Sequence, residues 1–111
     1  MAQLVKNIIP RKQAEAAQTT QYTAVNCKTV IDKFTVTNTS AGAVVFYGWL
    51  VASGGAAGNS NAIIFNKSIA VGETYGCPDM VGQSLESGGF IVTEAGAATS
   101  LTISATGREL T

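Results

Sequence analysis

Histidine is absent from the 111-residue sequence, and its absence excludes several kinds of active site. Without an imidazole there is no Ser-His-Asp or Cys-His nucleophile pair and no histidine-ligated zinc. The two cysteines, Cys27 and Cys77, are too few for a zinc site made of cysteine alone and too far apart for a CxxC redox motif. We expect free, buried thiols, because a disulfide suits a secreted domain better than one assembled in a reducing cytosol.

Charge is also scarce. Seven Lys and Arg balance seven Asp and Glu, and charged residues make up 13% of the chain. A nucleic-acid binder needs a basic surface that displaces counterions from phosphates, so no nucleic-acid partner is expected. The carboxylates are scattered along the chain rather than paired, and no calcium-binding loop motif occurs. The sequence therefore predicts no catalytic residues, no metal ligands and no cofactor, and a protein that is not an enzyme.

Long hydrophobic runs are missing as well. The longest apolar stretch, residues 44–52, is about half the length of a transmembrane helix and contains Gly48. No secretory signal pattern opens the chain. We therefore expect no membrane partner, and a chain of this length predicts one domain with a real core.

The pattern of apolar residues favours strands over helices. Only two residues are proline, while β-branched runs alternate with turns rich in the twelve glycines. The clearest predicted strand covers residues 28–38. There we expect a mostly apolar alternating set to face the core (Val30, Asp32, Phe34, Val36 and Asn38) and the threonine-rich set to face outward or to meet a partner. Within the first set, Asp32 is expected either to pair with a Lys or Arg or to mark the end of the buried face.

The next predicted strand, in residues 43–52, is apolar on both faces. One face carries Val45, Tyr47, Trp49 and Val51, and the other Val44, Phe46 and Leu50. Because a two-layer sandwich covers one face of each sheet, the second face of this strand needs a further cover. A terminal arm and a neighbouring subunit are the two candidates.

Further extended segments complete an all-β pattern. They cover residues 4–9, 19–24, 62–69, 73–77, 90–95 and 101–110, which with the two strands above makes about eight. In the last of them Leu101, Ile103 and Ala105 alternate with Thr102, Ser104 and Thr106. This spacing predicts an antiparallel β-sandwich that is jelly-roll-like.

The first eighteen residues differ from the rest of the chain. An apolar piece is followed by Pro10, two basic residues and an alanine-rich tether. This suggests an extended N-terminal arm and tether in residues 1–18, and a β-sandwich domain in residues 19–111. The alternative is that the apolar piece forms the first strand of the domain's own sheet.

Residues 53–60 are rich in glycine and small side chains and predict a flexible loop. They end without the GK[ST] motif of a phosphate-binding loop. Tyr47, Trp49, Asn59 and Asn61 have the chemistry of a carbohydrate site, in which aromatic rings stack on sugars beside amides. The same aromatic residues in an apolar run also suit a core or an interface.

From Ile31 onward the chain resembles small structural proteins of tailed bacteriophages. The residues that carry the resemblance lie in segments 34–40, 53–55, 67–75, 80–88 and 101–110, and the region that they span from Ile31 onward is about 80 of the 111 residues. The resemblance implies a virion component, most specifically a capsid decoration or cement protein that binds and stabilises the major capsid protein shell. It also implies a location on the capsid surface after synthesis in the bacterial cytoplasm. A tail or head-tail accessory subunit, and a carbohydrate- or host-binding module, are the alternatives.

This hypothesis assigns partner contacts to two places. Leu4, Val5, Ile8 and Ile9 would engage the major capsid protein or another virion subunit, and Tyr47 or Trp49 would anchor an interface or the core beneath it. A homo-oligomer, either a dimer or a trimer, is expected because virions supply two-fold and three-fold axes.

Overall fold

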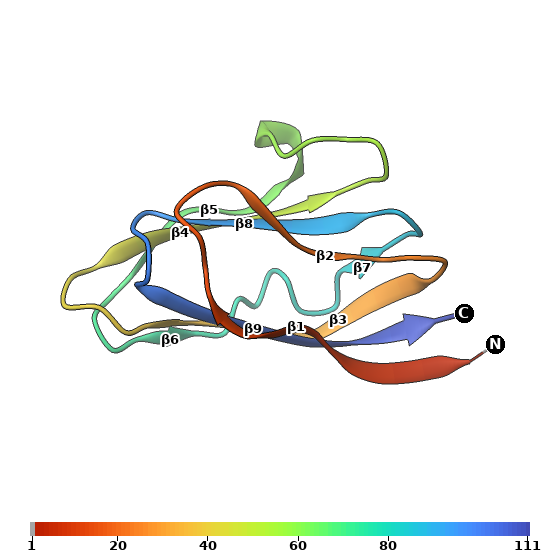
Figure 1. Ribbon diagram of the computed structural model, residues 1–111, viewed down its shortest axis with the longest axis horizontal. Helices are drawn as coiled ribbons and strands as arrows, with labels where there is room; N and C mark the ends of the chain where they lie inside the picture. Colours follow the sequence, from red (N-terminus) through yellow and green to blue (C-terminus); the bar gives the residue numbers. More distant parts are fainter. Residues whose placement is uncertain (1) are drawn as a thin grey trace.

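The protein is a sandwich of two antiparallel β-sheets in the computed structural model, which describes residues 2–111 (Figure 1). Sheet A has the strand order β1-β9-β3-β6, with β7 also paired to β3, and sheet B has the order β2-β8-β4-β5. The strands are β1 (Gln3–Gln13), β2 (Thr19–Thr23), β3 (Lys28–Asn38), β4 (Val44–Val51), β5 (Ala62–Ile69), β6 (Thr74–Tyr75), β7 (Ser84–Leu85), β8 (Phe90–Ala95) and β9 (Leu101–Leu110).

The topology is that of a jelly roll. The chain can be followed as one long, rolled-up hairpin in which successive strand pairs lie alternately in sheet A and sheet B. These pairs are β1 with β9, β2 with β8, β3 with β6 and β7, and β4 with β5. The prediction of an antiparallel, jelly-roll-like β-sandwich is confirmed. Residues 2–111 form nine strands rather than eight because residues 76–81 leave the edge of β3, and the chain returns to it at Gly82 and Gln83, which both hydrogen-bond the backbone of Ile31. Cys77 there has a positive φ of 45°, and Pro78 has no N–H to donate to a ladder.

The core lies between the two sheets and is built from alternating residues of both. Phe34 of sheet A meets Phe46 of sheet B, with ring centroids 6.3 Å apart. On β9, Leu101, Ile103 and Ala105 are buried, as the alternation predicts. Further buried members of this cluster are Ile8, Ile9, Ile31, Val36, Ile64, Ile69, Met80, Leu85 and Ile91.

Strand β3 begins and ends where the sequence predicts, but half of its face assignment is wrong. Phe34, Val36 and Asn38 are buried as expected, whereas Asp32 is exposed and Val30 is partly exposed. The pairing with β9 shifts register between Ile31 and Lys33, which marks a β-bulge. Because a bulge adds one residue to one strand, the alternation changes phase, and Ile31 faces the core in place of Val30.

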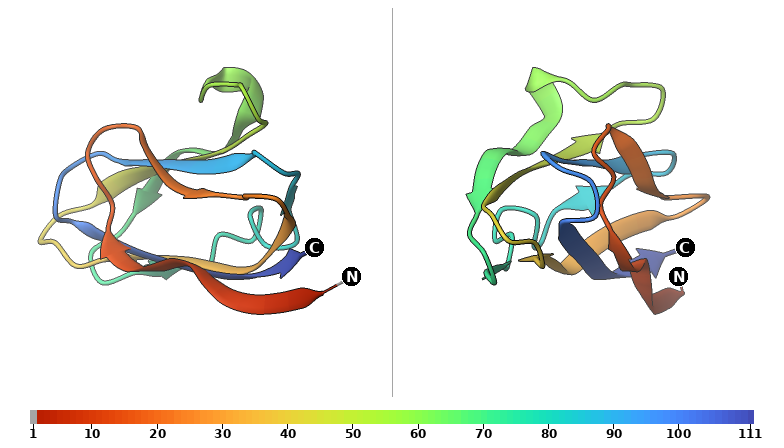
Figure 2. Two further views of the ribbon diagram at one scale, coloured as in Figure 1. Left: turned by 45° about the vertical axis from the view of Figure 1, so that its right-hand side comes forward. Right: turned by 60° about the vertical axis from the view of Figure 1, so that its left-hand side comes forward.

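The N-terminal segment is an edge strand of sheet A. Residues 3–13 form β1, which pairs antiparallel with β9 from Gln3 opposite Leu110 to Gln13 opposite Thr102. The backbones of Ala2 and Thr111 exchange two hydrogen bonds, so the two ends of the described chain lie side by side (Figures 1 and 2). Of the two alternatives predicted for this segment, the structure shows the second, in which the apolar piece forms the first strand of the domain's own sheet. Residues 3–13, which were expected to belong to an arm, are therefore part of sheet A.

The outer faces of the two sheets differ. On sheet A the outward positions of β3 and β9 are polar and rich in threonine. On sheet B the chain between β4 and β5 projects away from sheet A, as the green segment in Figure 2 shows, and contains the single-turn 3-10 helix η1 (Asn59–Asn61). Residues 2–111 contain no helix long and apolar enough to cross a membrane.

Candidate functional site

Three aromatic side chains gather on the outer face of sheet B. Tyr47 and Trp49 lie two residues apart on β4 and therefore share a face, and their rings stack with centroids 5.8 Å apart and an interplanar angle of 7°. Phe65 of the neighbouring strand β5 meets Tyr47 edge to face, with centroids 5.3 Å apart and an angle of 78°. We call Tyr47, Trp49 and Phe65 the aromatic cluster.

The members of the aromatic cluster differ in how much of each side chain is exposed to solvent. Trp49 is 3% exposed, whereas Phe65 is 62% exposed. Trp49 packs in a small second core with Val51 and Val92, to which Ala57 and Ala62 also contribute. This face is covered around Trp49, but by the β4–β5 connection of the same chain and not by either predicted candidate, a terminal arm or a neighbouring subunit. Phe65 is the member that remains available to another molecule.

Asn61 holds the β4–β5 connection in place. Its Nδ2 donates to the carbonyl oxygen of Ala56 at 2.9 Å, and its Oδ1 accepts from the backbone N–H of Gly58 at 3.0 Å. These bonds give the loop, expected to be flexible, a defined conformation. They also engage both polar atoms of Asn61, so of the predicted sugar-binding amides only Asn59 is left to meet a ligand.

A hollow of about 330 Å³ lies beside the exposed ring of Phe65 and is lined by Asn59, Ala62 and Phe65. The Tyr47 hydroxyl donates to Oδ1 of Asn66 at 3.2 Å, which orients the phenol at the edge of the cluster. This surface offers an aromatic ring and an amide. It suits an apolar side chain of a partner protein or the face of a sugar.

The N-terminal residues predicted to contact a partner divide into two pairs. Leu4 and Val5 are 57% and 67% exposed. Ile8 and Ile9 are 3% and 1% exposed and belong to the core, so they are not available for an interface while β1 stays in sheet A. The register shift between Lys6 and Ile9 allows two consecutive isoleucines to be buried.

The structure does not bring the predicted interface residues into one patch. Leu4 and Val5 lie at the free edge of sheet A, and the aromatic cluster lies on the outer face of sheet B. Phe65 was not among the residues singled out from the sequence, because its strand segment predicted only an alternating apolar pattern. The polar residues that follow it, Asn66 and Lys67, are the signal that this strand has a solvent side.

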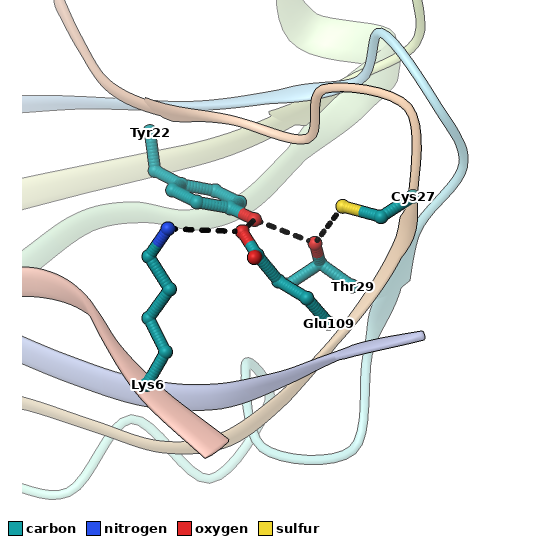
Figure 3. Close-up of polar contacts among 5 residues, drawn as sticks. All are labelled: Lys6, Tyr22, Cys27, Thr29 and Glu109. Atoms are coloured by element: carbon teal, nitrogen blue, oxygen red, sulfur yellow. Dashed lines mark hydrogen bonds and ion pairs between the residues drawn. The ribbon is translucent and has the colours of Figure 1, made fainter. Parts of the chain in front are cut away.

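A polar network that the sequence did not predict closes one end of the sandwich (Figure 3). The hydroxyl of Tyr22 on β2 donates to Oε2 of Glu109 on β9 and lies 2.7 Å from Oγ1 of Thr29 on β3. Lys6 of β1 reaches the same carboxylate at 3.3 Å. The hydrogen bond from Tyr22, assisted by Lys6, lowers the pKa of Glu109. Burial, followed by the bond to Glu109, raises the pKa of Tyr22.

Both cysteines are buried thiols, as predicted. Burial raises the pKa of Cys77 to about 12, so at neutral pH it lacks the thiolate that nucleophilic or metal-binding chemistry needs. Within residues 2–111 there is no group of three or more Cys, Asp and Glu side chains placed to hold a metal ion. The carboxylate of Asp32 is engaged by Nε of Arg108, at 3.1 and 3.0 Å from its two oxygens.

Comparison with known proteins yields a likeness of fold. No protein-family model and no curated protein matches the sequence. Among solved structures, the chain is similar to a chain in the structure of infectious bursal disease virus Gx strain, with a TM-score of 0.50 and 14% sequence identity. The match covers 98% of this chain and 33% of that chain, so this chain spans about a third of its neighbour's length. At this identity the likeness shows a shared β-sandwich architecture.

Proposed function

We propose that the protein is a virion structural subunit, and specifically a capsid decoration or cement protein of a tailed bacteriophage that binds the major capsid protein. One observation carries the proposal. The β-sandwich is similar in fold, over 98% of its length, to about a third of a chain from a virus structure. Double-sheet jelly rolls are a recurrent fold of viral capsid domains.

The surface of the molecule supports a role in protein contacts. Phe65 on sheet B and Leu4 and Val5 at the edge of sheet A are large apolar side chains that remain exposed. A cement protein acts by surface complementarity and requires no reacting groups. We therefore propose a binding role rather than an enzymatic one, with assembled shell subunits as the partner.

The test is the location and copy number of the protein in purified particles of the virus that encodes it. The proposal predicts that the purified protein adds to assembled shells lacking it, at a copy number set by shell symmetry. Location at the tail or at the head-tail junction would instead establish an accessory subunit. Absence from the particle would overturn the virion role.

A carbohydrate- or host-binding module is the second candidate. The observation that favours it is the hollow beside Phe65, where an exposed ring adjoins Asn59. This function predicts that the isolated protein binds glycans and that Phe65→Ala abolishes the binding. A decoration protein would retain shell binding in the presence of saturating glycan.

A further inference from the structure

A polar groove of about 330 Å³ crosses the outer face of sheet A, on the opposite side of the molecule from the aromatic cluster. It runs over the adjacent strands β1, β9 and β3. Its lining consists of hydroxyls from four threonines and Ser104, the amide of Asn7, and the cationic side chains of Arg11 and Lys33. No carboxylate is among the described residues that line it.

Among residues 2–111, the two cations in this groove are the basic side chains that have neither an ion pair nor a contact with an aromatic ring. Four of the seven basic side chains form ion pairs, and the ammonium of Lys67 lies 4.9 Å from the ring centroid of Tyr75. Arg11 and Lys33 are the other two across residues 2–111, and both line the groove. The ion pairs are Lys6–Glu109, Lys12–Glu15, Lys28–Glu86 and Arg108–Asp32.

The position of these charges follows from the strand order. Arg11 is on β1 and Lys33 on β3, with β9 between them, so the two strands that carry them lie two strand spacings apart, roughly 10 Å. Asp32, next to Lys33 in the sequence, is held by Arg108 and leaves Lys33 uncompensated. Arg11 and Lys33 therefore lie on opposite sides of the same groove.

The floor of the groove offers hydrogen-bonding groups between the two charged side chains. Thr102 accepts from Gln13, Thr37 bonds Thr74, and Thr106 donates to Asn7. Thr35 and Ser104, directly opposite each other on β3 and β9, take no part in these bonds. Their hydroxyls can each donate to and accept from a ligand.

We propose that this groove binds an acidic segment of a partner protein, with carboxylates on Arg11 and Lys33 and the intervening chain over Thr35 and Ser104. Two separated cations with neutral donors between them match an extended peptide that carries at least two carboxylates. Nucleic acid fits less well, since two charges on a chain of net charge zero give little counterion release. This inference rests on the proposed function, under which the partner is another virion subunit.

The first test is a titration of the intact, folded protein with hexaglutamate, followed by amide NMR shifts. Hexaglutamine and inorganic phosphate serve as comparison probes. The groove variant is R11Q/K33Q, and the matched control is K12Q/K28Q, which removes the same charge from side chains that do not line the groove. We expect hexaglutamate to shift amides of β1, β3 and β9, and R11Q/K33Q to weaken binding about tenfold or more, in line with the loss of charge-assisted hydrogen bonds. The control should bind within about twofold of the wild type, because diffuse attraction is weak and screened by salt.

Equal weakening in both double variants, or no binding of hexaglutamate at millimolar concentration, would overturn the proposal. Phosphate binding as tight as hexaglutamate, with the same loss in R11Q/K33Q, would overturn it by showing a small-anion site.

A second measurement separates this inference from the proposed function. Wild-type protein, R11Q/K33Q and K12Q/K28Q are each added to shells that lack the protein. Attachment of the wild type and the control, but not of R11Q/K33Q, supports both proposals. Equal attachment of all three overturns the groove as the shell contact and leaves the virion role standing. Failure of the wild type to attach overturns the decoration or cement role, and the peptide titration then decides the chemistry of the groove by itself.

Discussion

The hydroxyl of Tyr22 donates a hydrogen bond to the carboxylate of Glu109 and thereby joins sheet B to sheet A at one end of the sandwich (Figure 3). Thr29, fully buried, lies within hydrogen-bonding distance of the same phenol at 2.7 Å. Most contacts between the sheets are apolar and non-directional, so this bond contributes orientation as well as energy.

Removing the Tyr22 hydroxyl should destabilise the fold. We expect Tyr22→Phe to lower the free energy of unfolding by about 1–2 kcal/mol, since it leaves Glu109 and Thr29 with one partner fewer. Urea unfolding followed by circular dichroism measures this as a lower midpoint with an unchanged m-value. Tyr47→Phe is the matched control, because its hydroxyl bonds the exposed Asn66. An equal loss in the two variants would contradict a special role for Tyr22.

Acid should remove the contribution that Glu109 makes to the stability of the fold. The pKa of this carboxyl is lowered in the folded state, so its stabilisation is present above the unfolded value of about 4.3 and is lost as the pH falls through the folded pKa. We expect Glu109→Gln to be less stable than the wild type at pH 7, and the difference to shrink below about pH 4. Urea midpoints between pH 2.5 and 7 test this. Glu86→Gln, at an exposed position, should follow the wild-type curve, and a pH-independent deficit in Glu109→Gln would refute the explanation.

The native thiols should resist modification. Cys77 is completely buried with its pKa raised to about 12, and Cys27 is 6% exposed. We expect an aromatic disulfide reagent at pH 8 to react slowly with both thiols in the native protein. In urea, it should react rapidly with both. Ser87→Cys adds an exposed thiol as a positive control and should react at once. Rapid reaction of either thiol in the native wild type would contradict the burial of that cysteine.

Gly107 should tolerate no side chain. A Cβ at this position on β9 would overlap the carbonyl oxygen of Val30 and press on Ile8. We expect Gly107→Ala to cost about 2–3 kcal/mol through overpacking at the β1–β9–β3 junction. Gly42→Ala is the control, because an added Cβ there meets nothing within 4 Å. Thermal unfolding of the two variants should separate them clearly, and similar melting temperatures would show that the strands part more easily than the structure indicates.

Exposed apolar residues should matter for attachment and not for folding. We expect Phe65→Ser and the double variant Leu4→Ser/Val5→Ser to keep wild-type stability within about 1 kcal/mol and to attach less well to shells. Deleting the first ten residues is a poorer experiment, because it also removes the buried Ile8 and Ile9. Phe34→Ala, in the core, should instead cost about 3–5 kcal/mol. Normal attachment of both surface variants would exclude these residues as contacts.

Much of the fold followed from the sequence alone. The scarcity of proline, with β-branched runs separated by glycine-rich turns, determined an antiparallel sandwich. The alternation of Leu101, Ile103 and Ala105 with hydroxyl residues determined which side of β9 is buried. These features depend on the two-residue period of a strand, which acts locally.

Other features depended on which strands pair. The bulge at Asp32, the burial of two consecutive isoleucines in β1 and the covering of Trp49 by its own loop were decided by register and by the path of the chain, which no local pattern encodes. The same holds for Tyr22 with Glu109 and for Arg11 with Lys33. These pairs are distant in sequence, and each is brought to one site only because the tertiary fold places β9 between β1 and β3 and lays β2 over the other sheet.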